Sequence, residues 1–116
     1  MNANVVTHLH LDDPSMRERI AAFGRRWQVR ELALFGSALR DDFRSDSDVD
    51  VLVTFAASAP WSLFDVARME RELSGIFGRA ADVLEKAALR NPFRRQRILS
   101  EQQVIYVDDA NTTIAG

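Results

Sequence analysis

The chain has 116 residues, of which 47% are hydrophobic and 28% charged, and its formal net charge at pH 7 is −2. These values are typical of one globular domain, and a slightly acidic chain is not typical of a dedicated nucleic-acid-binding protein. Direct nucleic-acid binding is therefore not expected. The absence of cysteine excludes disulfides, thiolate zinc sites and cysteine nucleophiles.

No apolar run approaches the roughly 18–20 residues of a membrane span. The first residues also lack the basic start and apolar core of a secretory signal. We therefore expect a cytoplasmic protein without membrane contact. Residues 1–14 are predicted to be a loosely ordered N-terminal extension, 15–107 a single domain, and 108–116 a polar C-terminal tail.

The first predicted helix begins at Ser15, because Ser15 and Glu18 have the spacing of a capping box. Its apolar stripe follows the helical period. The stripe consists of Met16, Ile20, Phe23 and Trp27.

A short apolar run, Leu32 to Phe35, predicts a strand buried on both faces that ends at Gly36. Residues 37–40 could form one helical turn, and the polar residues 41–47 are turn-like. The next strand, 48–53, alternates in character. We expect Val49, Val51 and Val53 on one face and Asp48, Asp50 and Leu52 on the other.

The remaining elements alternate between helix and strand. A helix is predicted over 62–77, with Gly78 as its stop, and a short strand over 80–84 carries Asp82. Asn91 and Pro92 are typical of the cap and first position of a helix that ends near Ser100. A last strand covers 104–107. This order predicts an α/β (α+β) domain with helices packed on a small mixed sheet.

Asp48 and Asp50 are candidate metal ligands, since residues two apart on a strand share one face, with Cα atoms roughly 7 Å apart. Two carboxylates about 4 Å apart repel by roughly 4 kcal/mol at an effective dielectric near 20. Magnesium would relieve that repulsion and prefers oxygen ligands. Asp82, on a later strand, would complete a site for two ions.

These acids allow two other interpretations. Residues 46–50 resemble the start of an EF-hand loop, but Val51 and Ala57 stand where that loop needs glycine and glutamate. Aspartates before a strand are also common turn and cap residues. The Asp-Val-Asp pattern by itself favours that turn interpretation, and the fixed spacing to an upstream Gly-Ser pair reverses the preference.

Gly36 and Ser37 also allow two interpretations. Glycine after a strand can simply make a tight turn, and serine can cap a helix. In the functional interpretation, Gly36 lets the backbone approach a phosphate and Ser37 offers a hydroxyl and an N–H group. The chain has neither the Walker phosphate loop nor the G-x-G-x-x-G fingerprint.

Gly36-Ser37, ten intervening residues and then Asp48-Val49-Asp50 resemble the signature of the DNA polymerase β-like nucleotidyltransferase superfamily. The small size and the third aspartate point to its minimal members, the MNT proteins. The end of the chain is similar to the family's terminal helix and strand, through Arg94, Arg97, Ile98, Glu101, Ile105 and Tyr106.

This resemblance implies that Asp48, Asp50 and Asp82 are metal ligands and catalytic carboxylates. It implies nucleotide phosphate contacts at Gly36, Ser37 and Arg40. The implied chemistry is Mg²⁺-dependent nucleotidyl transfer with ATP as substrate, in which two ions bridge the triphosphate. Asp82 would also be able to accept the proton of the attacking hydroxyl.

Minimal members resemble antitoxins encoded beside a HEPN-type ribonuclease toxin, and some transfer AMP to a tyrosine of that toxin. The resemblance therefore implies an antitoxin that adenylylates a HEPN partner. A domain of this size could also form a homo-oligomer or a hetero-oligomer. The family usually has glycine after the matching arginine, where this chain has Asp41. That departure favours an alternative, an antitoxin that acts by contact alone. A third alternative, transfer to a small molecule, usually requires an added acceptor domain.

Arg90, Arg94, Arg95 and Arg97 cluster around the last predicted helix. They could form a solvated face, or they could contact phosphates or an acidic partner surface. We expect structural roles for Trp27, Trp61 and Tyr106, although Trp61 follows Pro60 at a helix start and could also lie at an interface. We expect His8 and His10 to be tail residues rather than metal ligands.

Overall fold

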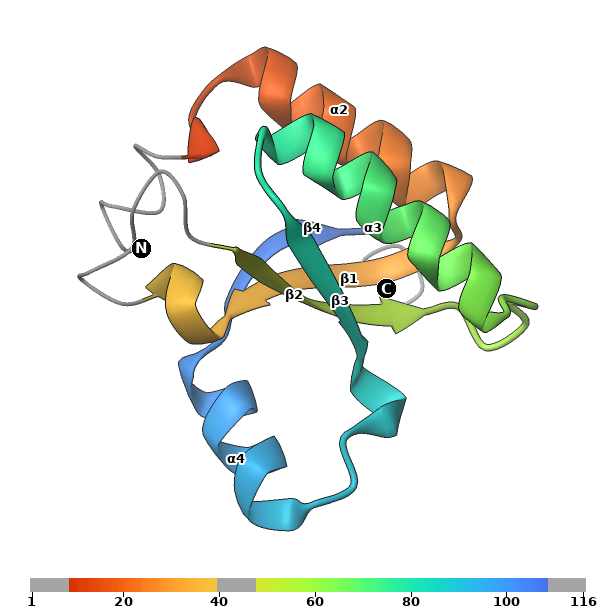
Figure 1. The fold of residues 1–116 in the computed structure, drawn as a ribbon, viewed down its shortest axis with the longest axis vertical. Coiled ribbons are helices and arrows are strands. Elements are labelled where there is room, and N and C mark those ends of the chain that lie inside the picture. Colours follow the sequence, from red (N-terminus) through yellow and green to blue (C-terminus); the bar gives the residue numbers. More distant parts are fainter. Residues whose placement is uncertain (1–8, 40–47, 109–116) are drawn as a thin grey trace, which may run out of the picture.

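The computed structural model of the chain describes residues 9–39 and 48–108. The expected turn at 41–47 and the C-terminal tail from 109 lie outside this part. The described chain forms a four-stranded mixed sheet with helices on both faces (Figure 1). This confirms the predicted α/β class, and no described helix combines the length and apolar composition that a membrane crossing requires.

The first described helix, α2 (Pro14–Arg26), begins one residue earlier than predicted. Its N-cap is Asp13, whose carboxylate accepts a hydrogen bond from the Ser15 backbone N–H at 2.9 Å. The predicted capping box of Ser15 and Glu18 is therefore wrong. Pro14 decides the boundary, because proline lacks an N–H group and suits the first position of a helix.

The sheet has the strand order β3-β2-β1-β4. β1 (Val29–Phe35) pairs antiparallel with β2 (Val49–Phe55) and with β4 (Gln103–Val107), whereas β2 pairs parallel with β3 (Ala81–Glu85). Short 3₁₀ turns, η1 (Gly36–Leu39) and η2 (Lys86–Ala88), follow β1 and β3. Each strand thus lies within a few residues of its predicted position.

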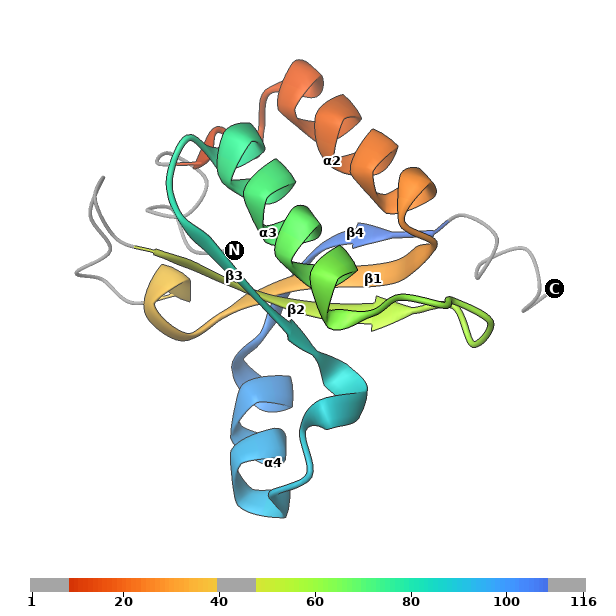
Figure 2. The same cartoon turned by 45° about the vertical axis from the view of Figure 1, so that its right-hand side comes forward.

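The parallel pair β2 and β3 is joined by α3 (Leu63–Phe77). Ser62 and Asp65 form a capping box at its start, and Gly78 ends it in a left-handed conformation with φ of 73°. Both ends match the predicted helix. α3 and α2 lie together on one face of the sheet, and α4 (Pro92–Glu101) lies on the other (Figures 1 and 2).

The main core lies between the sheet and the pair α2 and α3. The predicted stripe of α2 contributes to it, as do Met69, Leu73 and Ile76 of α3. The core also includes Leu9 and Leu11, which are 0% and 7% exposed, so the packed region begins before residue 15. The valines of β2 face this core, as the alternation predicted, while Leu52 packs on the α4 side.

The aromatic residues expected to be structural do pack within the fold. The rings of Trp27 and Trp61 meet edge to face at 5.0 Å, and the Trp61 indole N–H donates to the Trp27 carbonyl oxygen at 2.7 Å. Tyr106 is half-buried against the same core. A Cβ atom at Gly24 would collide with the Tyr106 ring, so glycine lets α2 approach β4 closely.

Candidate functional site

The end of β1 brings Gly36 against the carboxylate of Asp50. Phe35 is the partner of Asp50 in the antiparallel ladder, so the chain leaves β1 directly beside that side chain. Gly36 has φ of +65°, and a Cβ atom built there would lie 2.5 Å from Asp50 Oδ2. Any larger residue would therefore be strained and would displace the carboxylate.

Asp82 is the direct partner of Asp50 in the parallel ladder between β2 and β3. Paired residues on neighbouring strands point to the same face, and the strands lie about 4.8 Å apart. Leu52 identifies this face, because it lies two residues beyond Asp50 and packs on the α4 side. Two of the three predicted acids are therefore neighbours on the α4 face of the sheet.

The segment that carries Asp82 is held by α3 through two hydrogen bonds. The Ala81 N–H donates to Ser74 Oγ at 3.0 Å, and the Val83 N–H donates to Glu70 Oε2 at 2.8 Å. β3 is an edge strand, so these are backbone groups that no further strand would satisfy. Glu70 and Ser74 thus fix the backbone on both sides of Asp82.

Asp48 and Ser37 are the other predicted site residues whose backbone lies in the described part of the chain. Asp48 is exposed just before β2, and the next N–H group, that of Val49, donates to the Ala80 carbonyl oxygen at 2.8 Å. This bond places Asp48 at the same end of the sheet as Asp50 and Asp82. Ser37 lies in η1, but its side chain is outside the described part, as are Arg40 and Asp41.

Within residues 9–39 and 48–108, no three Asp, Glu or His side chains converge into a ready-made metal cage. Magnesium is commonly held by one or two carboxylates together with substrate phosphates, rather than by an all-protein cage. The paired positions of Asp50 and Asp82, with Asp48 at the same end of the sheet, fit an ion of that kind. The donor set is all oxygen, which suits Mg²⁺.

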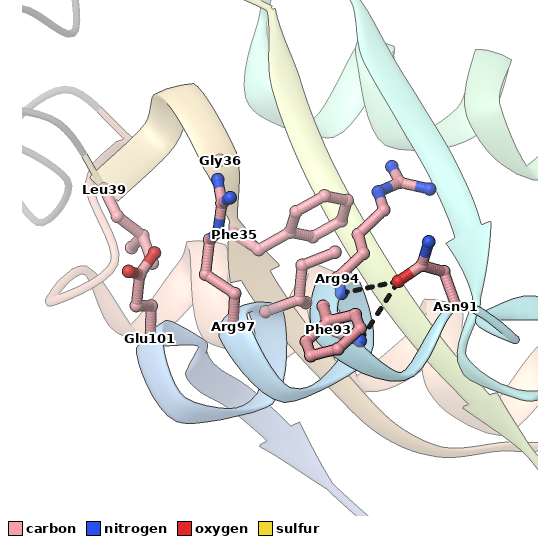
Figure 3. Close-up of a pocket in the computed structure, with 9 residues that line it drawn as sticks. Phe35, Gly36, Leu39, Asn91, Phe93, Arg94, Arg97 and Glu101 are labelled. Carbon is pink, nitrogen blue, oxygen red and sulfur yellow. Dashed lines mark hydrogen bonds between the residues drawn. The ribbon is translucent and has the colours of Figure 1, made fainter.

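A cavity of about 580 Å³ lies between the end of β1 and α4 (Figure 3). Gly36 is in its wall, so the cavity adjoins the residue that contacts Asp50. Both apolar and polar side chains line it. The apolar ones are Phe35, Leu39, Phe93 and Ile98, and the polar ones are Asn91, Arg94, Arg97 and Glu101.

α4 is fixed in place at several points. As predicted, Asn91 caps the helix: its side-chain oxygen accepts from the N–H groups of Phe93 and Arg94 at 3.0 and 3.1 Å (Figure 3). Arg95 donates to the carbonyl oxygens of Lys86 and Leu89, which follow β3. Ile98 is only 8% exposed. The helix therefore forms a wall of the cavity that is anchored to the segment following β3, the strand that carries Asp82.

The sequence interpretation missed Phe93, which lines the cavity although it is 83% exposed. A signal was present, because Phe93 stands in a polar helix, off the face that carries Ile98. The arginines of the predicted cluster have different roles. Arg94 and Arg97 line the cavity, whereas Arg95 anchors the helix.

The chain matches the nucleotidyltransferase domain family over residues 16–105. It is 33% identical over 82 residues to the protein adenylyltransferase MntA of Thermococcus cleftensis, a match that covers 71% of this chain and 78% of that relative. It is also 30% identical over 92 residues to a candidate protein adenylyltransferase of Methanocaldococcus jannaschii, covering 79% and 90% of the two chains.

Solved structures give the same result. A candidate minimal nucleotidyltransferase superposes with a TM-score of 0.61 at 32% identity, over 76% of this chain and 87% of that chain. A chain of a toxin–antitoxin complex with AMP-PNP has a TM-score of 0.64, over 84% and 78% of the two chains, and at 14% identity this likeness shows the fold. The fold and these relatives define a nucleotidyltransferase. The chain belongs to the nucleotidyltransferase domain family and, within it, to the minimal nucleotidyltransferases.

Proposed function

We propose that the chain transfers AMP from ATP to a hydroxyl group, that of a tyrosine, on a HEPN-type toxin, and thereby acts as its antitoxin. The observation that carries the proposal is the pairing of Asp50 with Asp82 directly beside Gly36. This pairing supports the proposal, because two carboxylates, which are suitable cation ligands, lie next to a glycine whose backbone a phosphate could approach.

In this proposal, Asp48, Asp50 and Asp82 hold Mg²⁺, and Gly36, Ser37 and Arg40 contact the phosphates. When bound, Mg²⁺ would neutralise the triphosphate and lower the pKa of the attacking hydroxyl. The oxygen of that hydroxyl forms the new bond to the α-phosphorus, and pyrophosphate leaves. Asp82 accepts the hydroxyl proton. Asp50 keeps its place because Gly36 leaves room for its carboxylate.

The proposed partner rests on the relatives. One is named a protein adenylyltransferase. Chains of similar fold occur in the toxin–antitoxin complex MntA–HepT, at a TM-score of 0.58, and in a complex of a tri-AMPylated Shewanella oneidensis HEPN toxin with its MNT antitoxin, also at 0.58. These two are 12% and 14% identical to this chain, so they support the partner only by analogy.

The test is to incubate the protein with labelled ATP, Mg²⁺ and the product of the adjacent gene, which is expected to be the HEPN partner. The expected result is one or more AMP groups on a partner tyrosine, found by intact mass and peptide mapping, and none with Asp50→Asn. Asp12→Asn is the matched control, because Asp12 is an exposed acid that precedes α2, which lies on the other face of the sheet. An unlabelled partner that the wild-type protein still neutralises would overturn the transfer.

A second function, neutralisation of the toxin by contact alone, is favoured by one observation. Asp41 stands where the family usually has glycine, close in sequence to the proposed phosphate contacts. Under this alternative, Asp50→Asn would neutralise the toxin as well as the wild type does. Asp41→Gly would then create or raise AMP transfer. That result would show that aspartate in place of the usual glycine suppresses the activity.

A further inference from the structure

Arg94 and Arg97 are placed to bind an anion in the cavity beside α4. They are three residues apart on one helix, so their side chains leave from neighbouring positions on the same face. Both side chains line the cavity, and both rise from α4 on the side where Phe35 and Gly36 lie (Figure 3). The Arg94 and Arg97 side chains thus line the same cavity as the glycine that approaches Asp50, with that of Arg97 extending toward Gly36 and that of Arg94 rising on the other side of Phe35 (Figure 3).

A third arginine of the same helix, Arg95, has a different role from Arg94 and Arg97. Arg95 turns the other way and anchors α4 to the chain after β3 through the carbonyl oxygens of Lys86 and Leu89. Arg94 and Arg97 are exposed, so the packing of α4 does not depend on their charges. A helix anchored by one arginine thus presents two others to the cavity.

The chemistry of the cavity indicates the kind of ligand. Guanidinium groups are planar, always charged and suited to phosphate oxygens. Glu101 is the only acid in the cavity lining as described, so the lining carries net positive charge. Gly36, in the cavity wall, lies against the Asp50 carboxylate, and Asp82 is the neighbour of Asp50. A ligand that reaches from the arginines to the carboxylates needs a polyanion at the arginines and a bound cation at the carboxylates.

The size of the cavity suits a small molecule of this type. Its volume of about 580 Å³ falls within the roughly 300–1,000 Å³ of ligand pockets. We propose that this cavity binds the polyphosphate of a nucleoside triphosphate, and that Arg94 and Arg97 hold the phosphate groups that leave as pyrophosphate. The proposal relies on the proposed function only for the identity of the ligand.

The test compares the binding of ATP analogues to purified variants. The double variant Arg94→Gln/Arg97→Gln is measured with a non-hydrolysable ATP analogue, inorganic tripolyphosphate and adenosine, each with Mg²⁺, by calorimetry. Arg90→Gln is the matched control, because Arg90 is an exposed arginine next to α4 that does not line the cavity. Thermal denaturation confirms that each variant is folded.

The expected result is a rise of about ten- to a hundredfold in the Kd of the ATP analogue and of tripolyphosphate, since hydrogen bonds between charged groups are lost. Adenosine binding and the Arg90→Gln variant should be unchanged. An equal loss for adenosine, or a Kd for the ATP analogue no higher than that of Arg90→Gln, would overturn the proposal.

The two proposals fail in different ways. If the wild type labels its partner and the double variant binds the ATP analogue as tightly as Arg90→Gln, the role proposed for Arg94 and Arg97 is wrong and the proposed AMP transfer stands. If the double variant loses triphosphate binding and the wild type labels no partner, the role of the two arginines stands and the proposed AMP transfer is wrong.

Discussion

The two faces of the sheet are built for different purposes. Within residues 9–39 and 48–108, the face under α2 and α3 has a core of seventeen buried residues, whereas the face under α4 has five. Asp50 points to the α4 face, its partner Asp82 lies beside it, and the cavity lined by Arg94 and Arg97 is on this face too. Hydrophobic burial, which supplies most of the folding free energy, is thus concentrated on the face without the site.

This division explains how one strand can serve both purposes. β2 alternates, so its valines enter the larger core while Asp50 emerges on the other side. The packing of the valines therefore fixes the strand that carries the Asp50 carboxylate, although the carboxylate itself is not part of that core. Changes on the α2 and α3 face should alter stability, and changes on the α4 face should alter ligand binding or activity.

The largest expected effect compares two phenylalanines. Phe23 is 2% exposed in the larger core, and Phe93 is 83% exposed at the cavity. Phe23→Ala should lower the free energy of unfolding by about 3–5 kcal/mol, whereas Phe93→Ala should change it by no more than about 0.5 kcal/mol. Urea denaturation of both variants measures the difference, and equal losses would contradict the division between the faces.

The next effect separates backbone strain from displacement of Asp50. Gly36 and Gly78 have similar φ angles, +65° and +73°, but a Cβ atom meets Asp50 only at Gly36, and nothing lies within 4 Å at Gly78. Both alanine variants should lose about 1–2 kcal/mol of stability from strain. Only Gly36→Ala should also lose activity, by roughly a hundredfold, because Asp50, a proposed metal ligand, is displaced.

Steady-state AMP transfer and urea denaturation of the two glycine variants make this comparison. If Gly78→Ala lost as much activity as Gly36→Ala, strain alone would account for both variants. The role given to Gly36 in placing Asp50 would then be wrong.

A smaller effect is expected at Glu70, a residue of α3 that accepts a hydrogen bond from the backbone next to Asp82. Glu70→Ala removes the acceptor for the Val83 N–H, next to Asp82, and should cost about 1 kcal/mol of stability. Glu70→Gln keeps an oxygen acceptor and is the matched control. Amide hydrogen exchange at Val83 should accelerate in Glu70→Ala and much less in Glu70→Gln. Unchanged exchange in both variants would show that Glu70 does not hold this edge.

The sequence predicted most of the fold because its signals were local and agreed with one another. Ser62 and Gly78 mark both ends of α3, Asn91 and Pro92 mark the start of α4, and the alternation of β2 predicts its two faces. The error at the start of α2 arose where two signals competed. Ser15 with Glu18 has the spacing of a capping box, but Pro14 and Asp13 formed the actual start.

The site could be predicted only in part, since its remaining features depend on contacts between distant segments. The acids were predicted as site residues from their spacing and remain a prediction, and the pairing of Asp50 with Asp82 requires the strand register. The contact of Gly36 with the Asp50 carboxylate and the cavity beside Phe93 require the packing of β1 against β2 and of α4 against the sheet. No pattern within a single element contains that information.

The smallest expected effect concerns acid sensitivity, which should differ between the two faces because of the caps of their helices. Hydrogen bonds from the backbone N–H and the hydroxyl of Ser62 hold the pKa of Asp65, in the α3 capping box, below its ordinary value of 3.8, with a further contribution from Arg68. A lowered pKa means that the carboxylate stabilises the fold fully at pH values above its pKa in the unfolded state. This contribution is lost as pH falls through its pKa in the folded state.

α4 is capped by Asn91, which does not titrate. The stability difference between wild type and Asp65→Asn should therefore be constant above pH ~5 and shrink in more acidic solution, whereas the difference between wild type and Asn91→Ser should not depend on pH. Denaturation at a series of pH values measures both differences, and a pH-independent difference for Asp65→Asn would exclude Asp65 as a source of the acid sensitivity of the α2 and α3 face.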